Sequence, residues 1–258
     1  MPVTVRTEGP VAIVEFDNPP ANAFSGPVIT SLKSIIGQLA PDDGVRAVLF
    51  TSAGHRAFLS GADITEFPDM LADPSRLTRR AADVAELFEQ ITALPQPTIA
   101  AVRAPALGGG LEFLLLCDLV VSNPEARYGL PEVGLGIIPG GGGTQRLARR
   151  IGPARAMEMV LLGAPVTAAE ALSLGLVSRV VADEDVVSTA TGLARQLADR
   201  PRVAVQSAKR AITGGAGLPL SAALAIETRE FLTASASEDS REGVRAFLER
   251  RRPEFVHR

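Results

Sequence analysis

The fold of this chain is constrained most by the way short apolar segments alternate with helical ones in its first half. Residues 45–52 (VRAVLFTS) and 97–102 (PTIAAV) have the length and the composition of buried strands. Between them, residues 75–93 repeat their apolar side chains at helical spacing. Strands that alternate with helices in this way predict an α/β layered fold.

The N-terminal segment predicts a hairpin and a first helix. Residues 3–16 alternate apolar and polar residues on both sides of Gly9-Pro10, which is typical of a β-hairpin. NPPANAF follows as a loop, and Ser25 is a candidate N-cap for a helix that runs to about Ala40.

The second half of the chain contains more loops and helices and fewer strands. Glycine and proline punctuate the stretch ARYGLPEVGLGIIPGGGGTQRL, which indicates loops, and the chain is mostly helical from about residue 143. One short strand is expected at 178–181, and 186–252 predicts several amphipathic helices. We therefore expect a core over residues 1–195 and a C-terminal helical region over 196–258.

Composition excludes several classes of protein. The net charge of −3 gives the chain no general attraction to nucleic acid or to an anionic membrane surface. A single cysteine, Cys117, excludes an internal disulfide, and with only His55 and His257 as histidines we expect no zinc site and no other metal. There is no basic leader followed by an apolar stretch and no apolar run long enough to cross a membrane, so a cytoplasmic location is expected.

One carboxylate stands in an apolar run. Glu112 follows the glycines of ALGGGLEFLLLCDLVV, and burying a carboxylate is costly unless it is paired or hydrogen-bonded. A helix that begins at 108–110 presents free backbone N–H groups, which can stabilise an anion or a developing oxyanion. Glu112 would then be either a general base beside that site or an acidic residue of the first turn with its side chain turned to solvent. The glycines themselves are equally explained by close helix packing.

Two further segments leave alternatives open. Glu132, in GLPEVGLG, is either a second acid–base group or an ordinary surface glutamate at a helix start. Residues 61–63 (GAD), which follow Ser60, form a loop in which Asp63 can simply cap the next helix.

Other motifs fail on inspection. The glycines at 140–143 lack the lysine of a phosphate-binding loop, and GLGIIP lacks the third glycine of a dinucleotide fingerprint. No G-x-S-x-G nucleophile elbow is present.

Taken together, HRAFLSGADI, ALGGGLEFLLLCDLVV, YGLPEVGLGIIPGGGGTQRL and APVTAAEALSLGLVSRVV resemble the enoyl-CoA hydratase/isomerase, or crotonase, family, in its order and at its spacing. The resemblance covers nearly the whole chain. It implies an α/β fold with a crotonase-like ββα spiral core and a C-terminal helical region that packs against sister subunits, as a trimer or a dimer of trimers. It also implies a hydro-lyase of fatty acid β-oxidation that acts on an acyl-CoA thioester and needs no cofactor, coenzyme A being part of the substrate.

The resemblance also assigns roles to residues. The backbone N–H groups of Ser60 and Gly109 would form the oxyanion hole; relatives often have alanine where Ser60 stands. Glu112 would orient and deprotonate water, and Glu132 would protonate C2, so that water adds syn across the 2,3-double bond. The positions that match the family's coenzyme A and substrate contacts are Ala21, Ala23, Arg56, Ala62, Asp63, Ile64, Gly108, Pro131, Pro139 and Gly140.

Two points of the resemblance are specific to this chain. One of Arg250, Arg251 and Arg252 is expected to meet a phosphate of coenzyme A, possibly in a neighbouring subunit. Ala104 stands where relatives usually have glycine, so we expect a strained or rerouted loop there if the position requires a positive φ.

Rival functions remain at this stage. A Δ3-Δ2-enoyl-CoA isomerase needs one acid–base shuttle, which Glu132 can provide. A non-catalytic scaffold with the same fold would have no need of Glu112, Glu132 and the glycine run. The acidic balance and the single tyrosine argue against a nucleic-acid binder.

Overall fold

A central sheet organises the first part of the structure, a computed structural model that describes residues 1–258. Its six strands have the order β1-β2-β3-β4-β6-β9; β1 and β2 form an antiparallel hairpin and the other neighbours are parallel. A second sheet has the order β5-β7-β8. The strands are β1 (Val3–Glu8), β2 (Val11–Phe16), β3 (Ala47–Ser52), β4 (Thr98–Val102), β5 (Ala106–Leu107), β6 (Leu119–Ser122), β7 (Arg127–Gly129), β8 (Val166–Thr167) and β9 (Arg179–Val180).

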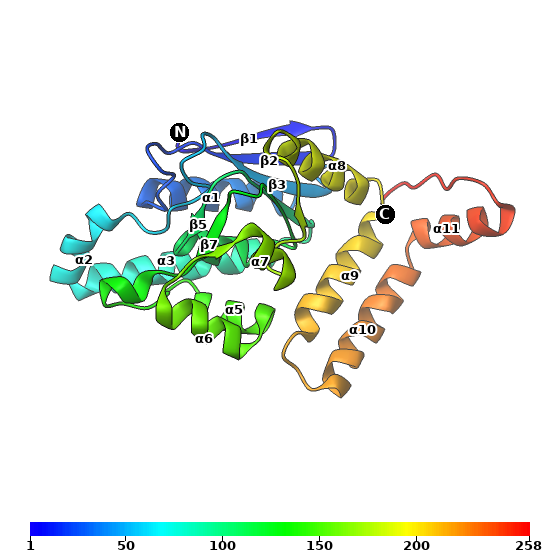
Figure 1. Cartoon of the computed structure of the whole chain (residues 1–258). Helices are drawn as coiled ribbons and strands as arrows, with labels where there is room; N and C mark the ends of the chain where they lie inside the picture. The colour runs from blue at the N-terminus through cyan, green and yellow to red at the C-terminus, as the bar shows by residue number, and fades with distance from the viewer.

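Helices cover both faces of the sheet and continue beyond it (Figure 1). The α-helices are α1 (Gly26–Leu39), α2 (Phe67–Ala72), α3 (Pro74–Thr92), α4 (Gly109–Leu114), α5 (Gly143–Ile151), α6 (Pro153–Leu162), α7 (Ala168–Ser173), α8 (Val186–Ala198), α9 (Arg202–Gly215), α10 (Leu220–Ser235) and α11 (Glu238–Glu249). Three short 3₁₀ helices are η1 (Ile64–Glu66), η2 (Glu132–Leu135) and η3 (Asp183–Asp185). None of the helices is long and apolar enough to cross a membrane.

The alternation of side chains along the strands builds two apolar layers. On β2, Val14 and Phe16 face the main core of 41 buried residues, to which α1, α3 and α4 also contribute. Val11 and Ile13 point to the other face, where a cluster of 12 buried residues joins the sheet to α8. The sheet is buried on both faces, as is usual for parallel strands.

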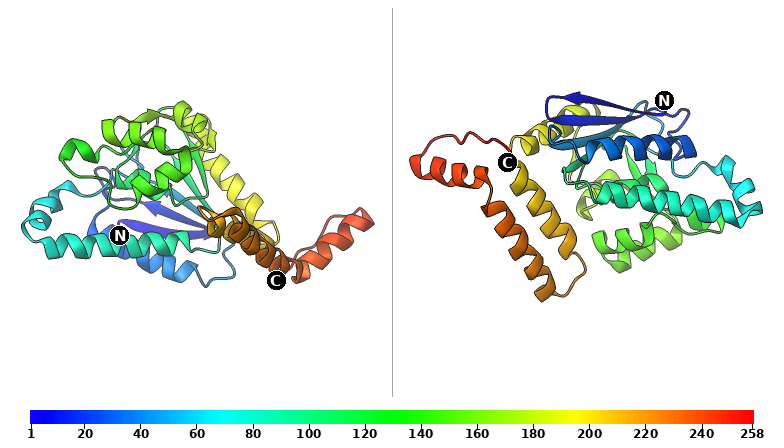
Figure 2. Two further views of the ribbon diagram at one scale, coloured as in Figure 1. Left: turned by 90° about the horizontal axis from the view of Figure 1, so that it is seen from below. Right: turned by 180° about the vertical axis from the view of Figure 1, so that it is seen from behind.

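The C-terminal helices extend away from this body. The helices α9 and α10 pack side by side as an antiparallel pair, and α11 continues beyond them (Figure 2). Lys209 ties α9 to the core, because its Nζ lies 2.8 Å from Asp118 Oδ2 and donates to the carbonyl of Gln96. The division at residue 195 stays a prediction; that residue lies within α8, and the chain leaves the sheet after Ala198.

Several expected elements match the structure, and others were missed. The hairpin, the helix over 75–93 and the strands near 45–52, 97–102 and 178–181 are all present. The second sheet was missed because its strands have only two or three residues, too few to show a period.

Two local expectations hold only in part: Ser25 is the N-cap residue but does not cap through its side chain, and the condition for strain at Ala104 is not met. Ser25 occupies the N-cap position of α1, but its hydroxyl makes no capping bond and instead accepts a long bond from Asn18 Nδ2. Ala104 does not have a positive φ, so alanine sits there without backbone strain.

Candidate active site

A cavity of about 590 Å³ lies among α3, η1 and α2, the N-terminus of α4 and the loop around η2. It contains nine of the residues expected in the site: Ser60, Ala62, Ile64, Gly108, Gly109, Glu112, Pro131, Glu132 and Gly140. Segments from four separate parts of the chain therefore meet in one place. No group of three or more histidine, cysteine, aspartate or glutamate side chains could hold a metal ion.

The glycine run is closely packed at one position and leaves a free backbone donor at another. Gly108 has φ +54° and ends the preceding strand, and α4 begins at Gly109. A Cβ at Gly110 would lie 2.0 Å from the carbonyl oxygen of Leu59, so this glycine is required by close packing. The N–H of Gly109, by contrast, donates to no backbone carbonyl, because the first residue of a helix has no acceptor within the helix and no loop carbonyl accepts from it here.

Glu112 is held by two backbone donors. Its side chain is 5% exposed, which rules out the alternative that it turns to solvent. Oε1 accepts from the N–H of Gly141 (2.7 Å) and of Gly143 (2.8 Å), the first residue of α5. A Cβ at Gly141 would lie 2.7 Å from Oε2, so a side chain there would displace the carboxylate. Both donors engage Oε1, which leaves Oε2 available to the cavity.

Opposing effects act on the pKa of Glu112. Burial raises the pKa of the carboxyl above its ordinary value, and this effect outweighs the two backbone hydrogen bonds and the positive charge of Arg146, which lower it. The N-terminus of α5 also favours a negative charge at this place.

Glu132 lies across the same cavity, at the first position of η2. Its Oε2 is buried without a hydrogen-bond partner. Burial, with a further contribution from the negative charge of Glu112, raises the pKa of Glu132 to about 7. The two carboxyl groups are therefore coupled, and near neutral pH the pair readily retains a proton.

The loop before η1 runs against the start of α4. A Cβ at Gly61 would lie 3.3 Å from the nitrogen of Gly109, and Phe24 and Ala62 form a β-bridge. The N–H of Ser60 donates a long bond of 3.4 Å to the carbonyl of Asn22, so it remains a weakly engaged donor.

Five residues expected to bind coenzyme A or substrate do not line the cavity: Ala21, Ala23, Arg56, Asp63 and Pro139. Asp63 accepts from the N–H of Thr65 and caps η1, as its simpler explanation predicted. Arg56 is exposed. Pro139 is buried and packs beside Gly143.

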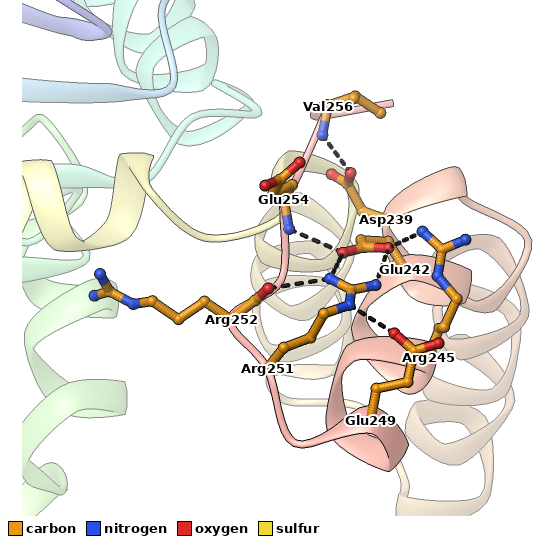
Figure 3. A network of polar contacts seen from close by, with 8 residues as sticks. All are labelled: Asp239, Glu242, Arg245, Glu249, Arg251, Arg252, Glu254 and Val256. Carbon is orange, nitrogen blue, oxygen red and sulfur yellow. Dashed lines mark hydrogen bonds and ion pairs between the residues drawn. The ribbon is translucent and has the colours of Figure 1, made fainter.

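The three C-terminal arginines differ in their availability. Arg251 is bound to Glu242 and Glu249, and Arg250 ends α11 in a left-handed conformation (Figure 3). The side chain of Arg252 points away from this network, and neither Arg250 nor Arg252 has an ion-pair partner, so both of these arginines are free to meet another group.

The sequence analysis missed the residues that hold Glu112 and the apolar wall of the cavity. Gly141 and Gly143 belong to the glycine run 140–143, which was tested only as a phosphate loop. The wall consists of Leu77, Ala81, Val84 and Phe88, all on α3. Their spacing of 4, 3 and 4 residues was a readable signal for one helix face, but not for what that face contacts.

Comparison with known proteins identifies the family. The family model described as enoyl-CoA hydratase/isomerase matches residues 6–258. The chain belongs to this family. A probable enoyl-CoA hydratase of Bacillus subtilis is 40% identical over 95% of both chains, and a short-chain-enoyl-CoA hydratase of Clostridium acetobutylicum is 37% identical over 98% of this chain and 96% of its own.

Solved structures agree with the family. The crystal structure of an enoyl-CoA hydratase from Bacillus anthracis superposes with a TM-score of 0.95 at 34% identity and covers 100% of both chains. The expectations of a crotonase fold and of an enzyme of this family are confirmed.

Proposed function

We propose that this protein is an enoyl-CoA hydratase that adds water syn across the 2,3-double bond of a 2-enoyl-CoA thioester to give a 3-hydroxyacyl-CoA. The observation that carries the proposal is the pair of carboxyl groups in one cavity, each with an oxygen free of protein partners. Hydratases named among the relatives support the same reaction.

The two acids divide the proton transfers. Glu112, fixed through Oε1, uses Oε2 to orient water and to take its proton as the oxygen attacks C3. Glu132, with a pKa of about 7, supplies a proton to C2. The step balances within the pair, because Glu112 gains one proton as Glu132 loses one, and the proton returns from Glu112 to Glu132 before the next turnover.

The thioester oxygen is bound by backbone donors. The N–H of Gly109 has no acceptor in the chain, and that of Ser60 has only a long one. A developing negative charge on the oxygen would strengthen both bonds, which lowers the barrier to attack at C3.

Coenzyme A enters as part of the substrate, so the reaction needs no separate cofactor. Ala62 and Ile64 line the cavity and suit contacts with the pantetheine arm, and Arg250 and Arg252, which have no ion-pair partner, are available for a phosphate. Any contact with coenzyme A by the five other expected residues would lie outside the cavity lining; these are Ala21, Ala23, Arg56, Asp63 and Pro139.

We expect a homotrimer or a dimer of trimers. Large apolar side chains are exposed on α10 and α11, including Phe231 at 67% and Phe247 at 82%. A patch of this kind is typical of a protein interface.

The deciding experiment mixes the purified protein with crotonyl-CoA and follows the loss of conjugated-thioester absorbance, with chromatographic identification of 3-hydroxybutyryl-CoA. A 3-enoyl-CoA is assayed in parallel, since one shuttling acid suffices to convert it to the 2-enoyl isomer. Conversion of the 3-enoyl thioester without any hydration would replace the proposal with an isomerase, and no reaction with either thioester would favour a scaffold.

A further inference from the structure

The cavity extends well beyond the two carboxyl groups as an apolar groove. Its rims carry exposed aliphatic side chains: Leu71 (61% exposed), Leu135 (61%) and Ile138 (68%). Leaving such side chains in water on both sides of one groove is unfavourable unless an apolar ligand covers them.

One face of α3 forms the floor of this groove. Phe88, Val84, Ala81 and Leu77 follow one another at helical spacing and all line it. A Cβ at Gly141 would lie 2.8 Å from Phe88 Cε2 and 2.7 Å from Glu112 Oε2, so the Phe88 end of this face adjoins the catalytic carboxylate. The face thus leads away from the reacting atoms.

The distance from Phe88 to Ala81 can be converted into a number of carbon atoms of an acyl tail. Seven residues of helix separate it from Phe88, which corresponds to about 10 Å. An extended chain of single bonds advances about 1.2 Å per bond, so Ala81 lies opposite the part of an acyl tail roughly eight bonds beyond the reacting carbons. Ala81 is the smallest side chain of the floor, and at this point the groove stays open.

The volume also exceeds what a short acyl group needs. An apolar cavity of about 150 Å³ holds the six carbons of benzene, so a four-carbon acyl group occupies only about 100 Å³. The groove belongs to a cavity of about 590 Å³, which also holds the thioester and the start of the pantetheine arm and still leaves room for a longer tail.

The groove contains no free charge that would select a polar tail. Arg80 is the one cation in its lining, and its side chain is only 16% exposed. Its guanidinium donates to the carbonyl of Phe24 and lies 3.5 Å from Glu66. With these partners it closes one side of the groove and leaves the tail an apolar surface.

We propose that Ala81 sets the chain-length preference, and that the substrates are 2-enoyl-CoA thioesters whose acyl groups have apolar tails and about ten carbons in all. The inference rests on the proposed function. The proposed chain length differs from the one in the name of the Clostridium acetobutylicum relative, a short-chain-enoyl-CoA hydratase.

The test compares kcat/KM for crotonyl-CoA, 2-octenoyl-CoA and 2-decenoyl-CoA. A fully buried methylene is worth about fourfold and a half-buried one about twofold, so six half-buried methylenes should raise kcat/KM roughly 60-fold from four carbons to ten. A flat profile, or one that falls with length while crotonyl-CoA is hydrated, overturns this inference and leaves the hydratase intact. Failure to hydrate any of the thioesters overturns the proposed function itself.

Two variants locate the effect. Ala81→Phe should lower the ratio of decenoyl to crotonyl kcat/KM by more than tenfold, because the ring fills the groove. Ala82→Phe is the matched control, since Ala82 is exposed on α3 and does not line the groove, and its ratio should stay within twofold of the wild-type value. A folded Ala81→Phe with an unchanged ratio would remove Ala81 from this role, and the wild-type profile remains decisive if that variant does not fold.

Discussion

The active-site body, which is the chain before residue 202, and the C-terminal arm, residues 202–258, differ in the kind of side chain that they bury. In the body, 41 buried apolar residues form one cluster around the sheet, and the buried polar side chains are few beside it; of these only Glu112 lines the cavity. In the helices of the arm, the buried residues are Ser207, Glu230, Asp239 and Ala246, three of them polar, while Phe231 and Phe247 face solvent. The body therefore contains a large apolar core of its own, whereas the helices of the arm bury almost no apolar side chain within the chain.

Ion pairs and backbone contacts maintain the arm instead. Glu242 binds Arg251 and Arg245 and accepts from the N–H of Glu254, and Arg251 holds the pKa of Glu242 far below its ordinary value (Figure 3). Asp239 accepts from the N–H groups of Val256 and His257, which folds the tail back onto α11. Exposed ion pairs contribute little free energy each, so this network fixes geometry more than it adds stability.

The comparison predicts its largest effect at the two carboxyl groups. Glu112→Gln and Glu132→Gln should each lower kcat for hydration by about 10²–10⁴, the usual range for an acid–base group, with the subunit mass unchanged. Glu125→Gln, at an exposed glutamate outside the cavity, is the control. Steady-state kinetics on crotonyl-CoA measure the difference, and near-normal turnover by a folded Glu112→Gln would contradict the two-acid mechanism.

A glycine pair tests how tightly the body is packed. Gly110→Ala places a Cβ 2.0 Å from a backbone oxygen and should lower the free energy of unfolding by about 1–3 kcal/mol or prevent folding. Gly37→Ala is the matched change in α1, where nothing lies within 4 Å, and should raise stability by about 0.5–1 kcal/mol. Thermal unfolding of both variants gives the signs, and equal effects would mean that the close approach of α4 to Leu59 does not constrain the core.

The arm should fail in a different way. Phe247→Asp introduces a charge into the exposed apolar surface of α11 and should reduce the mass of the assembly to that of a monomer, because an unpaired charge is costly to bury in an interface. Light scattering at micromolar concentration measures the mass. A wild-type protein that is already monomeric would show that the arm has no partner in another copy.

The sequence predicted the body better than the arm, for physical reasons. Strands 45–52 and 97–102 and the helix over 75–93 could be expected because a buried face imposes a period on them. The position of Glu112 could be expected as well, because a carboxylate in an apolar run requires donors. The identity of those donors could not, since Gly141 and Gly143 are brought to Glu112 only by the path of a loop. The direction of the arm also follows from no local pattern.

Titration of Glu132 separates chemistry from stability. Its folded pKa of about 7 lies above the ordinary 4.5, so the native state binds more protons between these values. The contribution of this group to stability is therefore fully present below pH 4.5 and is lost as the pH rises from there through 7, by on the order of 1–2 kcal/mol after solvent screening is allowed for. Glu132→Gln should abolish this loss. Denaturant unfolding at pH 5 and pH 8 measures it, and a wild-type slope retained in the variant would assign the titration to another group.

Activity should follow the same group. The singly protonated pair is the active form, so kcat/KM should fall above an apparent pKa near 7 that belongs to the pair. The fall in kcat/KM at high pH should be the same for hydration and for dehydration, because the equilibrium between enoyl and hydroxyacyl thioesters does not involve free protons. A kcat/KM that stayed constant from pH 6 to pH 9 would show that this pair does not control the reaction.

The smallest expected effect is at Ser60, on the border of the cavity. Ser60→Ala keeps the backbone N–H, so kcat should stay within about tenfold of the wild-type value. Gly109→Pro removes a donor and should cost roughly 10²–10³ in kcat, besides any effect of proline geometry on the start of α4. The two changes affect donors proposed for the same thioester oxygen, and only one deletes an N–H. If Ser60→Ala were as damaging as Gly109→Pro, the hydroxyl of Ser60 itself would take part in the reaction. The backbone N–H of Ser60, which now makes only a long bond to the carbonyl of Asn22, would then not be the group that matters at this residue.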